Sequence, residues 1–385
     1  MPRAYDDQPL KNRREGLTIR RISIAQVSLG QRELLAVQKV LKSGRLRAGA
    51  VTEDFEAGFA STVGARYAVA VSSGTAALYL AYRTLLRPGD EVIVPDFTFV
   101  ATAAMVMAVG AVPVFADVDL KTYNLDPSDV ERRITPRTRA IAPVHLYGLP
   151  ADVARLTRIA RRHHLHMVWD AAQAHGARFR GQDVGSFPDL VCYSFYPSKN
   201  MTTGEGGMLT TSDPSLAAQL RLLRSHGEQG RYFHIQVGFN FRLTDIAAAI
   251  GRVQLQKLPS AIRKRQRNAE ILARGLKRIP GIEIPRAAKG AEHAFNHFTV
   301  RVDPDTLGLS RQEFQDALLQ RGIETSVHYP RPLHRQRIFQ GYGTDRDLPI
   351  STLLAKTVLS FPVHPGLSPH DLQRITRTVR EVATS

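Results

Sequence analysis

Three short stretches of the chain combine residue types that could bind an anion, fix a carboxylate and present a nucleophilic amine. The first is residues 72–78, where small residues and Gly74 follow an apolar run and open a helical pattern. Small residues let backbone amides approach an anion, and a helix start favours negative charge. Ser-Gly-Thr before a helix is also an ordinary capped turn. No Gly-Lys-Ser/Thr follows, so the stretch is not a nucleotide P-loop.

The second stretch ends an apolar run with an acidic residue, in the order Met-Val-Trp-Asp at 167–170. An aspartate that ends a buried strand can simply cap the following turn. A carboxylate fixed at that place can also keep a pyridinium nitrogen protonated, which makes a pyridine ring an electron sink. Asp170 is therefore a candidate for either role.

The third stretch is 193–207, where Lys199 follows an apolar run and stands in a loop punctuated by Pro197 and by glycines. A solitary loop lysine is ordinarily solvated. A desolvated lysine has a lowered pKa and becomes nucleophilic near neutral pH. The order of an anion cradle, a strand-end aspartate and then this lysine favours the second interpretation.

Strands and helices alternate around these residues. Apolar runs of four to seven residues are typical of strands that are covered on both faces, and their alternation with helices indicates an α/β fold with a mostly parallel, doubly wound sheet. Ligands bind such sheets at the carboxyl ends of the strands. The predicted strands are 67–71, 92–95, 113–118, 140–145, 167–170, 190–195 and 207–210, and the predicted helices are 75–86, 99–109, 127–134 and 151–164.

The pattern changes after about residue 255. We expect a basic helix at 259–279, a strand at 298–302, a helix at 311–321, a loop rich in His, Pro and Arg at 328–337, and a final helix from about 369. The predicted organisation is an N-terminal leader (1–22), a large domain (23–255) and a smaller C-terminal α+β domain (256–385).

Composition excludes several classes of protein. The formal net charge is +17, but the basic residues are spread over helix-like stretches rather than gathered in one arm, which favours solvated helix faces over nucleic-acid binding. No apolar stretch approaches membrane-spanning length, and the first 21 residues lack the apolar core of a signal peptide. A single cysteine, Cys192, rules out an intrachain disulfide. We expect a cytoplasmic protein without a metal site.

Taken together, the motifs resemble the DegT/DnrJ/EryC1/StrS family of sugar aminotransferases, which has the fold type I architecture of pyridoxal 5′-phosphate (PLP) enzymes. The resemblance extends from about Ile24 to the C-terminal helix. The stretches that carry it are SSGTAAL (72–78), PDFTFVAT (95–102), PVHLYG (143–148), DAAQAHGA (170–177), YSFYPSKNMTTGEGGM (193–208), GFNFRLTDIAAAIG (238–251) and HYPRPLH (328–334).

The resemblance assigns a role to each matching position. It implies that Lys199 holds PLP as a Schiff base, that Asp170 pairs with the ring nitrogen and that Gln173 bonds the ring hydroxyl. Phe99 would stack on the ring, although an aromatic residue at an apolar helix start could equally belong to the core. The cofactor phosphate would be bound by Gly74, Thr75 and Ser194.

The resemblance also implies a homodimer, in which Asn240 or Arg242 reaches the neighbour's phosphate. His328, Tyr329 and Arg331 would lie on the substrate side. Arg331 and Arg335 make this loop more basic than is typical of the family. That charge suits an acceptor that carries a diphosphate, and Arg331 could alternatively be a solvated loop residue.

The implied reaction moves an amino group from glutamate to a nucleotide-linked keto-deoxysugar, through pyridoxamine 5′-phosphate (PMP). The motifs PVHLYG and HYPxPLH favour 3-keto over 4-keto acceptors. One alternative is a cyclitol aminotransferase of the same family, acting on an inosose. The sibling dehydratase class lacks the Schiff-base lysine, so Lys199 argues against it. A nucleic-acid-binding regulatory protein is suggested by the charge alone.

Overall fold

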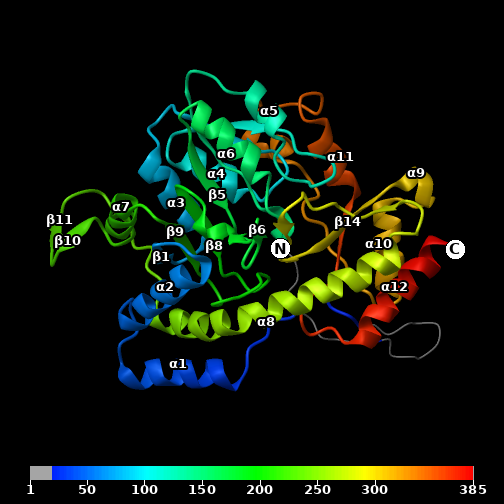
Figure 1. Ribbon diagram of the computed structural model, residues 1–385, viewed down its shortest axis with the longest axis horizontal. Helices are drawn as coiled ribbons and strands as arrows, with labels where there is room; N and C mark the ends of the chain where they lie inside the picture. Colours follow the sequence, from blue (N-terminus) through cyan, green and yellow to red (C-terminus); the bar gives the residue numbers. More distant parts are fainter. Residues whose placement is uncertain (1–19, 385) are drawn as a thin grey trace.

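A seven-stranded sheet forms the centre of the computed structural model, which describes residues 20–384 (Figure 1). The strand order is β1-β9-β8-β5-β4-β2-β3; β9 runs antiparallel to both of its neighbours and the other neighbouring pairs are parallel. The α/β fold with a mostly parallel sheet is thereby confirmed. The strands are β1 (Tyr67–Val71), β2 (Glu91–Pro95), β3 (Val112–Ala116), β4 (Thr138–Ile141), β5 (His166–Asp170), β8 (Leu190–Ser194) and β9 (Gly207–Thr211).

Helices cover both faces of this sheet. Apolar side chains of α2, α6 and α8 pack on one face, and those of α3, α4 and α7 pack on the other. The predicted helices correspond to α3 to α6 with ends that differ by a few residues, whereas α1, α2 and α7 were not predicted. The bounds are α1 (Gln31–Ser43), α2 (Ala50–Val63), α3 (Gly74–Leu85), α4 (Ala101–Ala108), α5 (Pro127–Arg132), α6 (Val153–Arg162) and α7 (Pro214–Arg224).

The long helix α8 (Asp245–Leu276) joins the two parts of the chain. The sequence predicted a start at Pro259, but Pro259 lies inside the helix, which begins where the Thr244 side chain accepts a hydrogen bond from the Ala247 amide. Burial against α1 and α2 carries the helix through a residue that has no amide hydrogen to donate. The predicted domain boundary between residues 255 and 256 falls within this helix.

A three-stranded sheet and four helices form the smaller C-terminal α+β part, as expected. Its elements are β12 (Ile282–Glu283), β14 (Phe298–Val302), β15 (Val358–Phe361), α9 (Pro304–Leu307), α10 (Arg311–Gln320), α11 (Pro349–Thr357) and α12 (Pro369–Ala383). Most of the predicted leader lies outside the described residues. At its end, however, Ile22 is buried here and pairs with Ile323, so residues 20–22 belong to this part of the fold.

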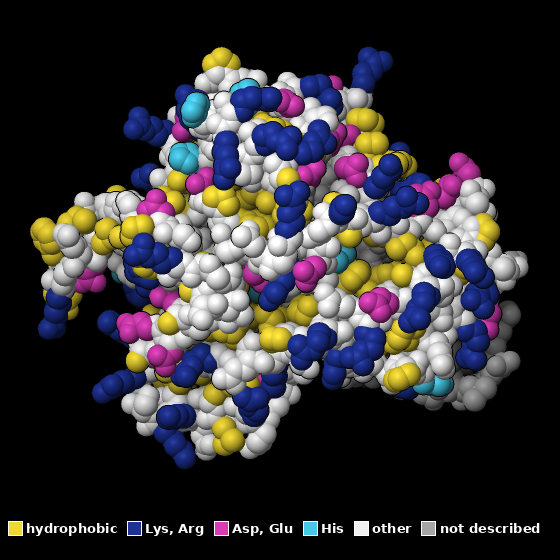
Figure 2. Space-filling model, in the orientation of Figure 1, with side chains coloured by type: hydrophobic (Ala, Val, Ile, Leu, Met, Phe, Trp, Pro, Cys, Tyr) yellow, Lys and Arg dark blue, Asp and Glu magenta, His cyan; other side chains and the backbone are white. Residues whose placement is uncertain are grey.

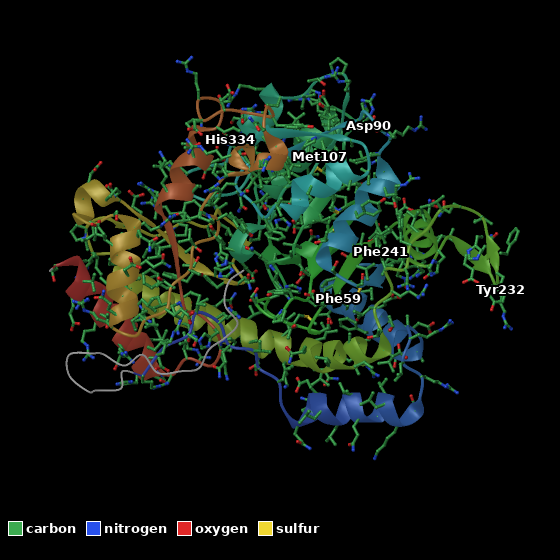
Figure 3. The ribbon with its side chains drawn as sticks, turned by 180° about the vertical axis from the view of Figure 1, so that it is seen from behind. Phe59, Asp90, Met107, Tyr232, Phe241 and His334 are labelled. Carbon is green, nitrogen blue, oxygen red and sulfur yellow. The ribbon has the colours of Figure 1, made fainter. Side chains whose placement is uncertain are left out.

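Short elements decorate the two cores. The hairpin of β10 (Glu228–Gly230) and β11 (Phe233–His234) projects away from the body, and Tyr232 lies at its tip (Figures 1 and 3). A second small sheet consists of β6 (Arg178–Phe179), β7 (Gln182–Asp183) and β13 (Ala291–Glu292). Single 3-10 turns are η1 (Leu146–Gly148), η2 (Val184–Ser186), η3 (Leu333–Arg335) and η4 (Arg337–Phe339).

Lysine and arginine side chains are distributed over the visible face of the molecule and form no single basic patch there (Figure 2). Within residues 20–384, no helix combines the length and apolar character needed to cross a membrane. No three His, Cys, Asp or Glu side chains of the described chain are grouped so that they could hold a metal ion.

Candidate active site

The carboxyl ends of β1, β5 and β8 meet at one edge of the central sheet. Because β9 is antiparallel to both β1 and β8, those two strands point the same way, and Val71 and Ser194 both pair with Gly207. β5 lies parallel to β8, so Asp170 and Ser194 end neighbouring strands. The topology thus brings the three stretches singled out in the sequence to the same edge.

Gly74 is the first residue of α3 and lies against Ser194. A Cβ on Gly74 would lie 2.7 Å from the Ser194 Cβ and 3.2 Å from its Cα, so a larger side chain does not fit without displacement of the backbone. The side chain of Ser73 caps the helix by accepting a hydrogen bond from the Ala76 amide at 3.0 Å. The amides of Gly74 and Thr75 precede the first hydrogen-bonded turn and are available to an anion.

Asp170 is buried at the end of β5. One of its carboxylate oxygens accepts a hydrogen bond from the Thr102 hydroxyl at 2.8 Å, and the other accepts from the Ala172 amide at 3.0 Å. Burial raises the pKa of Asp170, whereas these two bonds and the nearby Lys199 amine act to lower it. The two hydrogen bonds therefore hold the carboxylate in place, and together with the Lys199 amine they partly compensate its negative charge.

Lys199 is half-buried in the loop that follows β8. Burial lowers the pKa of its amine, and the carboxylate of Asp170 acts in the opposite direction. The loop is fixed to the C-terminal part of the chain, because the side-chain amide of Asn296 donates to the Ser198 carbonyl at 3.0 Å and that of Asn200 donates to the Ala294 carbonyl at 3.1 Å. Lys199 thus lies in a partly desolvated setting near the buried carboxylate of Asp170.

Gln173 connects this edge to the loop at 328–334. Its carbonyl oxygen accepts from the Tyr147 amide at 2.6 Å, and its amide nitrogen donates to the Tyr329 hydroxyl at 3.1 Å. The Tyr147 hydroxyl donates to the carbonyl of His328. Burial, together with the nearby Lys199 amine, lowers the pKa of His328 to about 4, so its ring is neutral at neutral pH.

Phe99 and Arg331 lie at more open positions. The Phe99 side chain is 54% exposed, and its ring centroid lies 6.1 Å from that of Tyr329. It therefore faces the site and does not belong to the core. Arg331 is exposed, and its guanidinium pairs with no carboxylate within the described chain. It lines a cavity of about 600 Å³ together with Arg335, Arg337 and Lys356.

Asn240 and Arg242 lie between the projecting hairpin and β1. Asn240 is exposed and bridges to Ser225, and Arg242 pairs with Val71 at the end of β1. Within residues 20–384, no hydrogen bond joins either side chain to the Lys199 loop. The described chain thus brings Gly74, Ser194, Asp170 and the Lys199 loop to one edge of the sheet and joins Gln173 to Tyr329. Arg242 lies beside the end of β1, whereas Asn240 bridges to Ser225.

The structure adds residues to which the sequence assigned no role. Thr102 and Tyr147 lie inside two of the recognised motifs, so the motifs located them but did not show what they contact. The pairing of Asp96 with His334 joins the motif at 95–102 to the motif at 328–334. Only the folded chain shows this pairing, because the partners lie 238 positions apart.

The fold and the arrangement of Lys199, Asp170 and the Gly74 cradle at one sheet edge define the class of fold type I aminotransferases. A putative sugar aminotransferase from Streptococcus pneumoniae, solved in its PMP form, superposes with a TM-score of 0.89 at 28% identity, over 94% of this chain and 98% of that one.

The family model described as "DegT/DnrJ/EryC1/StrS aminotransferase family" matches residues 27–380, and the chain belongs to this family. A dTDP-3-amino-3,4,6-trideoxy-alpha-D-glucose transaminase from Streptomyces venezuelae is 43% identical, over 90% of this chain and 91% of the relative. A UDP-N-acetyl-3-dehydro-alpha-D-glucosamine 3-aminotransferase from Acidithiobacillus ferrooxidans is 41% identical, over 90% and 92%. The protein is a sugar aminotransferase.

Proposed function

We propose that this enzyme carries PLP on Lys199 and transfers an amino group from glutamate to a nucleotide-linked 3-keto-deoxysugar. The observation that carries the proposal is the convergence of three features at the carboxyl edge of the sheet. These features are the lysine with a lowered pKa, the buried carboxylate of Asp170 and the glycine cradle at the start of α3. An amine, an acidic anchor and an anion cradle suit the aldehyde, ring nitrogen and phosphate of PLP.

The residues present fit the cofactor. The cradle of Gly74, Thr75 and Ser194 would hold the phosphate, and its shape depends on the missing side chain at Gly74. Phe99 would stack on the ring, and Gln173 would bond the ring hydroxyl with the side-chain amide hydrogen that it does not donate to Tyr329. When bound, PLP supplies an electron sink for the substrate carbon that loses a proton.

The chain's own groups handle the protons. An ionised Asp170 would keep the ring nitrogen protonated, and the bonds from Thr102 and Ala172 favour that ionised state. The Lys199 amine, once free, would act as the base that moves the proton between the donor α-carbon and the C4′ atom of the cofactor. Its lowered pKa keeps more of the amine neutral and able to accept that proton.

The names of the two curated relatives favour an acceptor that carries the keto group at C3. Both relatives act on nucleotide-linked sugars, and both names place the amino group at position 3. A nucleotide-linked acceptor is also favoured over a free cyclitol by these names. His328, Tyr329 and Arg331 would face this acceptor, with Arg331 next to its diphosphate.

The proposed active unit is a homodimer. The projecting hairpin and the segment that follows it expose apolar side chains that a second copy would cover: Tyr232 is 80% exposed and Val237 is 74% exposed. Asn240 and Arg242 follow directly along the chain, where they would complete the neighbour's phosphate site. Mixed dimers of Lys199→Ala and Asn240→Ala chains should then regain activity, because one of their two sites is intact.

Formation of a Schiff base between PLP and Lys199 can be measured directly. The purified protein supplied with PLP should absorb in the region of a protonated Schiff base, and borohydride should attach the cofactor to Lys199. Lys199→Ala should lose amino transfer and this labelling. Lys264→Ala should keep both, because Lys264 is an exposed lysine that lines a cavity of about 380 Å³ together with Lys199 but follows no strand of the sheet. A wild-type protein that gains no absorbance with PLP would refute the proposal.

The acceptor is identified separately. Protein and glutamate are incubated with dTDP- and UDP-linked 3-keto and 4-keto sugars and with an inosose, and each amino product is identified by mass. Amination of the 3-keto sugars is the expected result, and preferential amination of a 4-keto sugar or of the inosose would refute the assignment.

A further inference from the structure

His334 bridges two carboxylates from different parts of the chain. Its Nδ1 lies 2.7 Å from an Asp96 oxygen and its Nε2 lies 2.8 Å from an Asp345 oxygen. The His334 amide also donates to Asp96 at 2.7 Å, and the Leu333 amide donates to the Asp96 carbonyl at 2.8 Å. The side chains of His334 and Asp96 are buried, whereas that of Asp345 is 45% exposed.

A ring placed between two carboxylates is stabilised as the imidazolium. Only the protonated ring donates from both nitrogens, and a neutral ring would turn one lone pair toward a carboxylate. Burial by itself lowers the pKa of His334, but the hydrogen bonds to Asp96 and Asp345 raise it above its ordinary value. Burial raises the pKa of Asp96, and His334 counteracts that effect. The proton is therefore retained between these groups.

The bridge joins two segments of the proposed site. Asp96 directly follows β2 and is three residues before Phe99, while His334 follows Tyr329 by five residues. The ring centroid of Tyr329 lies 6.2 Å from that of Phe97 and 6.1 Å from that of Phe99. His334 thus ties the segment at 328–334, which it ends, to the segment at 96–99.

We propose that His334 is a positioning residue, which as an imidazolium clamps the Tyr329 segment onto the Phe99 segment and so fixes the acceptor side of the active site. This inference rests on the proposed function, in which both aromatic residues face the acceptor and cofactor. The clamp holds at neutral pH, where His334 is protonated and both aspartates are ionised, and it loosens at higher pH when His334 loses its proton.

Other charged groups face the clamp and set its environment. Asp117, which directly follows β3, adds negative charge near Asp96. Its carboxylate also accepts hydrogen bonds from the amides of Ile350 and Ser351 at the start of α11. Arg335 pairs with Asp345. His334 and Arg335 line the cavity of about 600 Å³ described above, and the other cationic residues that line it are Arg331, Arg337 and Lys356.

Asp345→Asn tests the clamp with little risk to folding, because Asp345 is exposed. The variant removes one carboxylate, so the pKa of His334 should fall and the proton should be lost at lower pH. In the wild type, the acceptor KM should rise as the pH increases through the His334 pKa, and in Asp345→Asn this rise should begin at lower pH. The glutamate half-reaction should follow the same pH profile in both proteins. Asp305→Asn, a change at an exposed aspartate of α9, is the matched control and should behave as the wild type.

His334→Asn separates the charge from the local shape. An asparagine amide can still donate to Asp96, but it carries no charge and cannot reach both carboxylates. We expect an acceptor KM raised about tenfold at neutral pH, the order of one hydrogen bond to a charged group, with no alkaline rise. A KM that kept the wild-type pH profile in this variant would overturn the proposal.

Two measurements do not depend on catalysis. Nitrogen NMR of the imidazole should show His334 still protonated above the ordinary histidine pKa of about 6.5. Hydrogen exchange at the amides of Arg331, Leu333 and His334 should accelerate when that proton is lost. Loss of the proton at or below the ordinary pKa would overturn the clamp even if amino transfer is observed. A protonated, protected His334 in a protein without amino transfer would instead refute the proposed function.

Discussion

At Asp170, burial and hydrogen bonding act on one carboxyl group in opposite directions. Burial favours the neutral acid, and the bonds from Thr102 and Ala172 favour the carboxylate. A ring nitrogen is kept protonated only by the ionised form. The residue that the sequence singled out therefore depends on a threonine whose contribution the sequence did not show.

Thr102→Val should weaken both half-reactions. Valine keeps the shape of the side chain but removes the donor 2.8 Å from Asp170, so the pKa of Asp170 rises further and its ionised form requires higher pH. The loss of one hydrogen bond to a charged group, about 1.5–3 kcal/mol, predicts a decrease of about tenfold or more in single-turnover rates.

The control is Thr84→Val, because among the described residues the Thr84 hydroxyl bonds only the Leu80 carbonyl, within its own helix. Equal rates in Thr102→Val and the wild type at all pH values would show that Thr102 does not support the ionised state of Asp170.

At the residue scale, a site residue can be predicted from the sequence when it stands next to a recognisable strand in the chain. Asp170 ends an apolar run, and Gly74 and Lys199 follow such runs within a few residues, so their positions near the ends of strands could be predicted. Thr102, Tyr147 and His334 act through partners that only the fold brings together. No local pattern indicates such partners.

At the scale of elements, α3 shows how a missing side chain shapes a site. Its first residue approaches β8 so closely that a methyl group at Gly74 would contact Ser194 at 2.7 Å. The helix start and the strand end therefore form one cradle, and its width is set by the packing of α3 on the sheet.

Gly74→Ala should lower the affinity for PLP by about tenfold or more, because the new methyl group pushes the amides of the cradle away from Ser194. Equilibrium titration of the protein with PLP, followed by absorbance, measures this effect. Gly58→Ala is the matched control: its Cβ would lie 3.5 Å from a Leu255 methyl, an ordinary contact, and alanine should stabilise α2 by about 0.5–1 kcal/mol. Unchanged PLP binding in Gly74→Ala would contradict the assignment of the phosphate site.

The elements differ in how far their sequences reveal them. All seven strands of the central sheet could be predicted, because continuous apolar runs mark strands buried on both faces. The predicted start of α8 was wrong because a proline is usually found in the first turn of a helix. Here the packing of α8 on α2 overrides that preference. The β10–β11 hairpin could not be predicted from a core pattern, since most of its residues are exposed.

At the scale of the whole molecule, the exposed apolar side chains of the hairpin and of the segment that follows it predict assembly. Tyr232→Ser combined with Val237→Ser should shift the sedimentation of the protein toward the monomer, since both side chains would be covered in the proposed dimer. Ile338→Ser is the control, because Ile338 is 55% exposed but lies away from the hairpin, in η4. A wild-type protein that sediments as a monomer at micromolar concentration would contradict the shared site.

The helix α8 has a consequence for how the molecule melts. Leu255, Leu258 and Ile262 belong to the core beneath the sheet, and Ala269 and Leu272 belong to the C-terminal core, so one rigid rod is shared by both. Unfolding either core would expose the apolar side chains that α8 buries in it and would destabilise the whole helix. The two parts should therefore denature together. Scanning calorimetry of the wild type should record a single endotherm, and chains severed between residues 255 and 256 should produce fragments that do not fold on their own. Two resolved endotherms would show instead that α8 unfolds locally near Pro259, in its middle, where one backbone hydrogen bond is already missing.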